Sequence, residues 1–449
     1  MRAGARPKRT MEFDSAQATT EALFAAALAA VDVRAAVART LAIEDGILTI
    51  PAVGFARPLA AIERIIVVAV GKAAGAMAAE AEAILGDRIT AGLALTKHGH
   101  GEEPGRIPLR EGGHPTPDKH GLAATDELLA LLHNLHPADL VLCLISGGGS
   151  ALLTAPAPPI TLDELRATTG LLLAAGANIN ELNAVRKHLE TLKGGGLARA
   201  AAPAQVVALV ISDVLGDPLD VIASGPCTGD STTFADAWAM LARRGLLDQL
   251  PAAVVAHLRA GLGGAIPETP EPDDPLFAHV SAATIANLPR AAEAAAARAT
   301  ALGWRPEIID LTIEGEAREV AQGLVARLLA LPAGERRCLI GGGETTVTVR
   351  GDGLGGRNTE LALAAALRLD GVLGCALASL STDGDDGPTG AAGAVATGTT
   401  AARGRALGLD AVDALARNDS ATYFRAVGGL VITGPTRTNV ADVYFLLRE

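Results

Sequence analysis

The chain has 449 residues and a formal net charge of −12; hydrophobic residues make up 49% and charged residues 20%. This balance excludes an intrinsically disordered protein. It also argues against general nucleic-acid binding, which needs a basic surface, but allows a small anionic substrate in a locally positive pocket. At about 100 to 200 residues per domain, the length indicates two or three domains.

The apolar stretches do not predict a membrane span. The strongest, Ile65–Val70, meets Lys72, and no stretch approaches about 18 uncharged apolar residues. Residues 1–10 are basic but lead into Glu12 rather than an apolar segment, so they predict a frayed tail, with Met11 as an alternative start. The four cysteines form no C-x-x-C pair and are expected to be buried free thiols. We expect a soluble, cytoplasmic protein.

The first half of the chain alternates predicted strands with predicted helices. Residues 16–45 have the helical spacing of an amphipathic opening helix. The following elements are a strand at 65–70, a helix to 85, a strand at 91–96, a helix at 120–135, a strand at 139–145, a helix at 161–177 and a strand at 205–211. Such alternation favours a parallel sheet, which binds ligands beyond the carboxyl ends of its strands.

Prolines and glycines loosen the pattern between residues 245 and 278, where we place a domain junction. The expected domains are 11–262 and 276–449. In the second, the pattern predicts a helix from about 282, a strand at 306–311, a helix at 315–331, a strand at 338–340, a hairpin at 345–350, a helix ending at 369 and a strand to about 379.

Lysine is scarce, because only six of the 38 basic residues are lysine rather than arginine. Because arginine supplies most of the positive charges in this sequence, we expect lysine at positions where a compact ammonium is needed. The six are Lys8, Lys72, Lys97, Lys119, Lys187 and Lys193.

Two glycine-rich motifs follow predicted strands. Ser146–Ser150 has three consecutive glycines between two hydroxyls, so its backbone N–H groups can approach an anion. We predict nucleotide contacts from Ser146, Gly147, Gly148, Gly149 and Ser150, with a structural turn as the alternative. Gly71 and Lys72 open a predicted helix, where the dipole disfavours a cation. An anion between Lys72 and the helix would explain the lysine, and a solvated lysine is the alternative.

Further polar residues stand near these motifs. Asn183, Lys187 and Lys193 could line a polyphosphate site or belong to a solvated helix with a glycine cap. Asp213 ends a hydrophobic strand, as do carboxylates that hold Mg²⁺ or a substrate hydroxyl. His114, in Gly-Gly-His-Pro-Thr-Pro, is the histidine placed to touch a ligand.

The second half carries a similar strand-then-glycine motif at Gly341–Glu344, from which we expect nucleotide contacts by Gly342, Gly343 and Glu344. Arg357 lies in a glycine-rich loop before a helix, where a guanidinium suits a phosphoryl group. Asp386 belongs to an acidic turn that could hold Mg²⁺ or be solvated, although the turn fails the EF-hand spacing.

Eight motifs occur in one order: VGKAAG, EGGHPTPD, ISGGGSALL, LNAVRKHLETLKGGGLA, ISDVLGDPLDVIASGP, GGGETTVTVRGDGLGGRNTE, STDGDDGPTGAAGA, and NDS followed by TGPTRTNVADVYFLL. This ordered set resembles the glycerate 2-kinases of the MOFRL type over about residues 16–447. The resemblance implies an α/β protein with a larger Rossmann-like N-terminal domain, a smaller C-terminal α/β domain, and an active site in the cleft between them.

The resemblance also implies an activity, namely ATP- and Mg²⁺-dependent phosphorylation of D-glycerate to 2-phosphoglycerate. It places the family's lysine on Lys72, its loop arginine on Arg357 and its strand-end aspartate on Asp213. We assign substrate binding to Gly71, Lys72, His114 and Arg357, catalysis to Lys72, Asp213 and Arg357, and metal binding to Asp213 and Asp386. Phosphoryl transfer needs such positioning and charge neutralisation.

Two other functions compete with this interpretation. A nicotinamide-dependent hydroxypyruvate reductase, a label that members of this family also carry, needs a dinucleotide fingerprint that the glycine spacing after Ile65–Val70 does not provide. A non-catalytic nucleotide- or sugar-phosphate-binding protein would not need Arg357, Asp213 and the acidic turn together. We expect no membrane or nucleic-acid partner, and a homo-oligomer is an open alternative to a monomer.

Overall fold

The computed structural model describes residues 12–101 and 105–449, so the expected tail and Met11 lie outside the described residues. The chain divides into two compact units. Residues 33–285 form the N-terminal unit, and residues 286–449 together with the opening helix form the C-terminal unit. The expected boundaries differ from this division, because helix α1 (Phe13–Ala30) packs on α11 (Leu288–Ala301) rather than on the N-terminal sheet.

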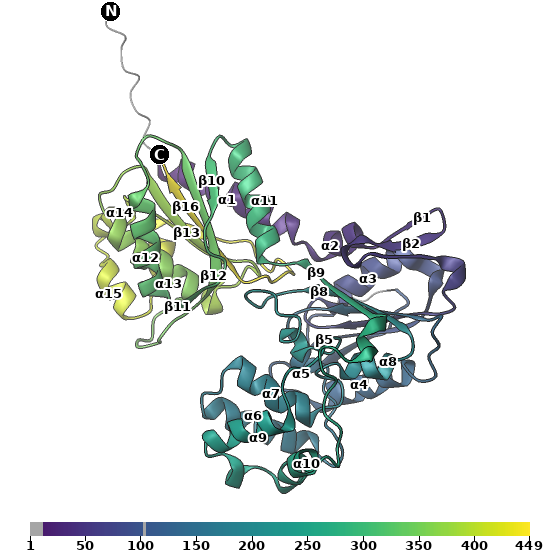
Figure 1. Cartoon of the computed structure of the whole chain (residues 1–449). Helices are drawn as coiled ribbons and strands as arrows, with labels where there is room; N and C mark the ends of the chain where they lie inside the picture. The colour runs from purple at the N-terminus through teal and green to yellow at the C-terminus, as the bar shows by residue number, and fades with distance from the viewer. Residues whose placement is uncertain (1–11, 102–104) are drawn as a thin grey trace, which may run out of the picture. The chain divides into compact units, whose positions relative to one another are not determined.

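The N-terminal unit is built on a six-stranded sheet with the order β6-β5-β4-β7-β8-β9 (Figure 1). Strands β4 and β7 are central and buried along their whole length, as their unbroken apolar sequences predict. The β6-β5-β4-β7-β8 part is parallel throughout, which confirms the predicted βαβ arrangement. The strands are β4 (Ile65–Val70), β5 (Ile89–Lys97), β6 (Leu109–Gly112), β7 (Leu140–Ile145), β8 (Gln205–Ile211) and β9 (Val280–Ala286).

Helices cover this sheet and form a separate cluster beside it. The helices that follow the strands are α3 (Ala74–Leu85), α4 (Lys119–Leu131), α5 (Gly149–Leu152) and α8 (Gly196–Ala201), with α2 (Val33–Thr40) packed on α3. A second apolar core holds together α6 (Leu162–Ala174), α7 (Ile179–Leu189), α9 (Phe234–Arg243) and α10 (Ala252–Leu262). A small antiparallel sheet comprises β1 (Ala42–Glu44), β2 (Ile47–Ile50) and β3 (Phe55–Pro58).

The C-terminal unit contains a mixed seven-stranded sheet with the order β10-β12-β16-β13-β14-β15, in which β11 also pairs with β12 (Figure 1). Its strands are β10 (Arg305–Ile308), β11 (Ile313–Glu316), β12 (Arg337–Thr346), β13 (Cys375–Ser381), β14 (Gly393–Thr397), β15 (Leu430–Val431) and β16 (Asp442–Arg448). Its other helices are α12 (Ala317–Ala330), α13 (Arg357–Leu369), α14 (Thr400–Ala406), α15 (Ala411–Ala416) and α16 (Ser420–Val427). Because β16 runs antiparallel to β12 and β13, its first residue lies at their carboxyl ends.

Four expected elements differ from the structure. Residues 16–45 form two helices and a strand, and the helix expected from about 282 begins at Leu288, after strand β9 and the capping side chain of Asn287. Strand β12 does not stop before the triglycine but runs through it to Thr346 and pairs with β11, so the hairpin expected at 345–350 does not form.

The triglycine in β12 has a packing reason. A Cβ atom on Gly343 would lie 1.9 Å from the carbonyl oxygen of Ile313, and one on Gly342 would lie 2.8 Å from that of Asp442. These glycines therefore serve close contact inside the sheet. The four cysteines are free and buried, as predicted. No helix within residues 12–101 and 105–449 is long and apolar enough to cross a membrane.

Candidate functional site

Three loops meet at the carboxyl ends of β4, β7 and β8. The backbone N–H of Lys72 donates to the carbonyl of Gly147 (2.9 Å), and that of Ala73 donates to Oγ of Ser146 (3.0 Å). The predicted loops 71–75 and 146–150 are therefore joined at the edge of the sheet where parallel α/β proteins bind ligands.

Glycine allows these loops to touch side chains that a Cβ atom would displace. A Cβ on Gly71 would lie 2.2 Å from Ser146 Oγ, and one on Gly147 would lie 1.9 Å from Asp213 Oδ2. One on Gly149 would meet the Cβ of Ala223 at 2.7 Å. The glycines predicted to approach a phosphate are thus also required by their protein neighbours, and they fix the place of the Asp213 carboxylate.

Lys72 and His114 both lie against Gly148, since a Cβ there would be 3.2 Å from Lys72 Cγ and 3.1 Å from His114 Cδ2. Burial lowers the pKa of His114 to about 4, with the positive charge of Lys72 as the next cause. Burial raises the pKa of Asp213, and the charge of Lys72 opposes that rise. The structure therefore brings a cation, a neutral imidazole and a carboxylate to one loop.

A hydrogen-bond chain fixes the last residue of this loop. The hydroxyls of Ser150 and Ser224 lie 2.8 Å apart, and Ser224 donates to Oδ1 of Asn183 at 2.8 Å. Because the Ser224 proton goes to Asn183, the Ser150 hydroxyl donates to Ser224 and is not available as a donor to a phosphate. Ser224 is buried and, like Ala223, has a positive φ, a conformation that side chains rarely adopt.

Lys187 and Lys193 have partners inside the protein. Nζ of Lys193 donates to the carbonyls of Ser150 (2.7 Å) and Leu153 (2.9 Å) and lies 3.2 Å from the Glu190 carboxylate. Burial lowers the pKa of Lys193, and Glu190 opposes this. Nζ of Lys187 lies 3.2 Å from Asp230, and the Lys187 side chain is buried. Because both ammonium groups have partners within the protein, these two lysines support the site rather than contact the nucleotide.

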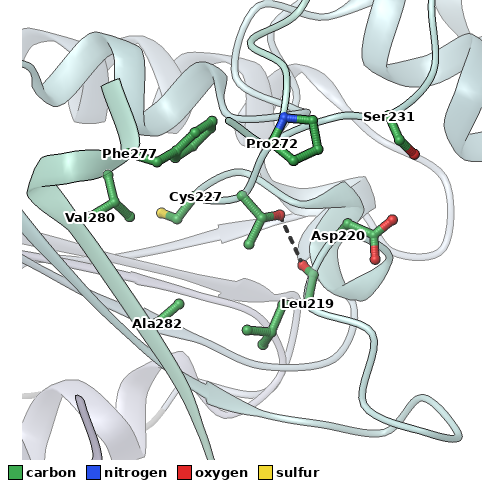
Figure 2. A pocket seen from close by; sticks show the side chains of 10 residues that line it. Leu219, Asp220, Cys227, Ser231, Pro272, Phe277, Val280 and Ala282 are labelled. Atoms are coloured by element: carbon green, nitrogen blue, oxygen red, sulfur yellow. Dashed lines mark hydrogen bonds between the residues drawn. The ribbon is translucent and has the colours of Figure 1, made fainter. Parts of the chain in front are cut away.

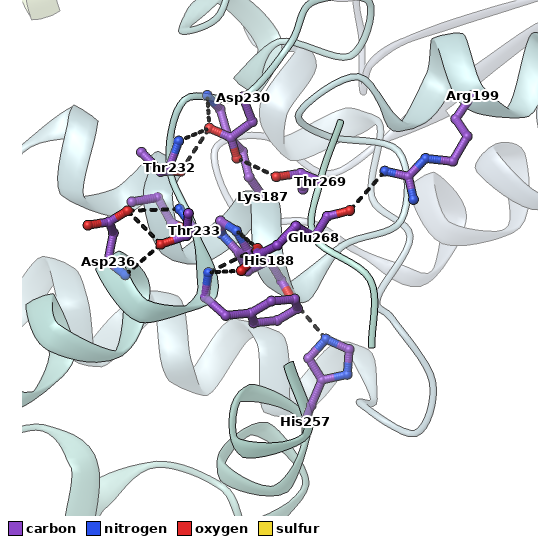
Figure 3. Close-up of polar contacts among 12 residues, drawn as sticks. Lys187, His188, Arg199, Asp230, Thr232, Thr233, Asp236, His257, Glu268 and Thr269 are labelled. Carbon is purple, nitrogen blue, oxygen red and sulfur yellow. Dashed lines mark hydrogen bonds and ion pairs between the residues drawn. The ribbon is translucent and has the colours of Figure 1, made fainter. Parts of the chain in front are cut away.

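Asp230 and Glu268 belong to a polar network that Figure 3 shows around Lys187 and His188. Thr269 donates to Asp230 (3.0 Å), and the ring of His188 lies 3.2 Å from Glu268, which accepts from the backbone N–H of Phe234. Residues 268 and 269 are thereby fastened to helices α7 and α9. The network accounts for Lys187 and His188 of α7 without a ligand, but it does not include Arg186, whose Nε is buried without a hydrogen-bond partner among the described residues.

An open pocket of about 510 Å³ lies beside this network in the N-terminal unit (Figure 2). Its wall is largely apolar, and the pocket contains none of the predicted site residues. The lining residues are Leu219, Asp220, Cys227, Thr228, Gly229, Ser231, Pro272, Phe277, Val280 and Ala282.

In the C-terminal unit, Arg357 is the first residue of α13. Its Nε and Nη2 donate to the two carboxylate oxygens of Asp442 at 2.6 and 2.9 Å, and its Nη1 lies 3.1 Å from Glu344. Burial lowers the pKa of Arg357, but the hydrogen bonds and charge of Asp442 outweigh it and raise the pKa overall. Sequence analysis does not predict a role for Asp442, because its only signal is its position at the start of an apolar strand.

Asp386 caps helix α13. Its two oxygens accept from the backbone N–H groups of Asn358 and Thr359, both at 2.8 Å. Burial raises its pKa, and these hydrogen bonds oppose the rise. These hydrogen bonds stabilise the first turn of α13, and the assignment of Asp386 to a metal stays a prediction. Gly342 and Gly343, inside β12, are not loop residues.

Taken together, the fold and these loops define a class of α/β protein whose parallel sheet carries a lysine, a carboxylate and a glycine loop at its strand ends. A model described as "Domain of unknown function (DUF4147)" matches residues 19–259, and a model described as "MOFRL family" matches residues 337–442. The chain belongs to the glycerate kinase family that combines these two parts.

Several relatives support this membership. A D-glycerate 2-kinase of Thermotoga maritima is 42% identical over 390 residues, which cover 85% of this chain and 90% of the relative. A putative hydroxypyruvate reductase of Agrobacterium vitis is 44% identical over 393 residues, 86% of this chain and 87% of the relative. A crystal structure of glycerate kinase from Thermotoga maritima superposes with a TM-score of 0.86 at 38% identity, covering 97% of this chain and 100% of that one.

Gly147→Ala tests whether the close contact between Gly147 and the Asp213 carboxylate matters for the reaction. Gly147→Ala should lower kcat by about 10²-fold, because its Cβ must push the carboxylate away, and a displacement near 1 Å can cost that much. The matched control is Gly170→Ala, in α6, where a Cβ meets no atom within 4 Å. Steady-state rates and melting temperatures of both variants test this; an active, folded Gly147→Ala enzyme would contradict it.

The lowered pKa of His114 predicts a pH dependence of stability. Its pKa is about 4 when folded and near 6.5 when unfolded, so the unfolded chain binds more protons between these values. The free energy of unfolding should therefore fall as the pH drops from about 6.5 to about 4. Urea unfolding of His114→Gln should show a shallower fall over this range; an unchanged slope would exclude His114 as its source.

Proposed function

We propose that the protein is a glycerate 2-kinase that transfers the γ-phosphoryl group of ATP to the 2-hydroxyl of D-glycerate. The observation that carries this proposal is the meeting of Lys72, Asp213 and the glycine loop at one edge of the parallel sheet. The names of relatives that share about 40% identity over most of the chain support the substrate.

The proposed reaction forms a bond between the 2-hydroxyl oxygen and the γ-phosphorus and breaks the bond to the β–γ bridging oxygen. Asp213 accepts the hydroxyl proton, a role that its raised pKa suits. Lys72 and Arg357 neutralise the transferring phosphoryl group and the glycerate carboxylate, and the backbone N–H groups of the 146–150 loop face the phosphates. His114, neutral at pH 7, adds a polar contact without a charge.

Mg²⁺ fits this arrangement through one protein carboxylate. Within the described ranges 12–101 and 105–449, no group of three or more His, Cys, Asp or Glu is arranged to hold a metal. Mg²⁺ in phosphoryl-transfer sites commonly takes one or two carboxylates, with substrate phosphates and water as its other ligands. Asp213 can supply such a ligand and would then orient the hydroxyl instead of taking its proton, whereas both oxygens of Asp386 accept backbone N–H groups of α13. The ion would neutralise charge on the phosphates.

The reductase alternative is not favoured by the site. The loop after β4 reads Gly71-Lys72-Ala73-Ala74-Gly75 and lacks the glycine spacing of a dinucleotide fingerprint. A purely binding protein would not need the Asp213 carboxylate against the glycine loop. The cytoplasmic location, the absence of membrane and nucleic-acid partners, and the oligomeric state stay predictions.

The product of the reaction tests the proposal directly. Protein, ATP, Mg²⁺ and D-glycerate should consume NADH when coupled through enolase, pyruvate kinase and lactate dehydrogenase without phosphoglycerate mutase. The signal should depend on glycerate and exceed the ATPase background. A signal that needs added mutase would mean phosphorylation at the 3-hydroxyl. No signal with folded protein in either arrangement would overturn the substrate, and NADH oxidation by hydroxypyruvate alone would favour the reductase.

Two substitutions test the proposed roles. Lys72→Ala should lower kcat by about 10²- to 10³-fold, because a charge placed at the transferring group is lost. Asp213→Asn should lower kcat by at least about 10²-fold without destabilising the fold, because burial already disfavours the charged carboxylate. Exposed Lys119, replaced by alanine, is the matched control. Wild-type rates in either site variant would remove that residue from the mechanism.

A further inference from the structure

The Arg357 guanidinium is shared between two carboxylates that differ in exposure. Asp442, which takes Nε and Nη2, has a side chain that is 0% exposed, whereas Glu344, which pairs with Nη1, is 51% exposed. An ion pair to an exposed carboxylate is weak because water competes for both groups. A buried carboxylate that loses its partner keeps an uncompensated charge, so that pair is costly to break.

A neighbouring carboxylate further weakens the ion pair between Glu344 and Arg357. Glu344 lies opposite Glu314 in the parallel register of β12 and β11, and Glu314 is exposed. Like charges at paired positions repel. This strand edge thus presents two neighbouring carboxylates, and Glu344 directs its own towards Arg357. An incoming anion that binds Nη1 meets competition from Glu344 but not from Asp442.

We propose that Glu344 is an exchangeable counter-ion of Arg357, displaced when an anionic oxygen of the substrate binds, and that Asp442 is the positioning residue that holds the guanidinium. This inference rests on the proposed function, which assigns Arg357 to the substrate. Glu344 then weakens binding of the carboxylate or phosphoryl group, a role opposite to the nucleotide contact expected from the sequence. Guanidinium groups favour two-point contacts with such anions, and one edge stays fixed by Asp442.

Glu344→Gln tests whether Glu344 is an exchangeable counter-ion of Arg357. With inorganic phosphate as the probe, calorimetry on the full chain should show several-fold tighter binding than wild type. The KM for the anionic substrate should fall by a similar factor. Glu307→Gln is the matched control, because Glu307 is 53% exposed and lies 3.2 Å from Arg337 in the same unit; it should leave both quantities unchanged. Equal or weaker phosphate binding in Glu344→Gln would overturn the proposal.

Arg357 must be the group through which this gain acts. In an Arg357→Ala background, Glu344→Gln should give no tighter phosphate binding, which separates this site from other anion contacts such as the glycine loop. A gain that persists without Arg357 would contradict the exchange. Because phosphate binding does not require turnover, a failed glycerate assay with a normal phosphate response would reject the proposed function alone, and the reverse result would reject only this inference.

Asp442→Asn tests whether Asp442 positions the Arg357 guanidinium. It should lower kcat at least tenfold, and Glu344→Gln should no longer tighten phosphate binding, since the guanidinium is not held. The matched control is Asp139→Asn, because Asp139 is also 0% exposed and takes Nε and Nη2 of Arg64; it should cost similar stability without the kinetic loss. If Asp442→Asn does not fold, Arg357→Lys removes the two-point contact instead. Wild-type kcat in Arg357→Lys or in folded Asp442→Asn would overturn this role.

Discussion

The absence of a side chain at Gly147 lets the Asp213 carboxylate rest on the loop that follows β7. A methyl group there would come within 1.9 Å of Oδ2. The same condition recurs at Gly71 against Ser146, so the two loops and the strand-end carboxylate form one interlocked surface. Packed groups of this kind do not deform gradually. The position of the proposed base is therefore set by backbone contact, and the raised pKa of Asp213 follows from the burial that this contact imposes.

Charge inside the N-terminal unit is distributed to maintain that surface. Lys193 ties the carbonyl of Ser150 to Glu190, and Ser224 connects the hydroxyl of Ser150 to Asn183. A buried ammonium is costly unless its protons are bonded, and these contacts meet that requirement. The scarcity of lysine drew attention to Lys187 and Lys193, whose ammonium groups are buried and paired, but also to exposed Lys119. It did not distinguish a lysine that supports the loop from one, such as Lys72, that stands beside it.

Local patterns predicted the parallel sheet and the strand-end loops well, because unbroken apolar strands such as β4 and β7 are unambiguous. They failed where distant contacts decide. Gly341–Gly343 resembles the glycine loop of Ser146–Ser150 in sequence, yet lies within a strand because β11 and β16 crowd it from both sides. Helix α1 belongs to the C-terminal unit and packs there through an apolar face. The sequence of that face does not indicate which unit it will contact. The contact of Asp386 with the first turn of α13 also joins residues 27 and 28 positions apart, and no local pattern indicates it.

Two arginine–aspartate pairs with a buried carboxylate show what such a pair contributes by itself. Arg64–Asp139 and Arg357–Asp442 share the same two-point geometry and the same complete burial of the carboxylate. Arg64 and Asp139 directly precede β4 and β7, at the ends of the strands remote from the glycine loops. Asp442 instead begins a strand antiparallel to its neighbours, which carries it to their carboxyl ends. A buried pair fixes a guanidinium wherever it occurs. Strand direction places the Arg357 pair at the carboxyl ends of β12 and β13 and the Arg64 pair at the opposite ends of β4 and β7. Topology, rather than the ion pair, therefore distinguishes the arginine that we propose to bind substrate from the one that we do not.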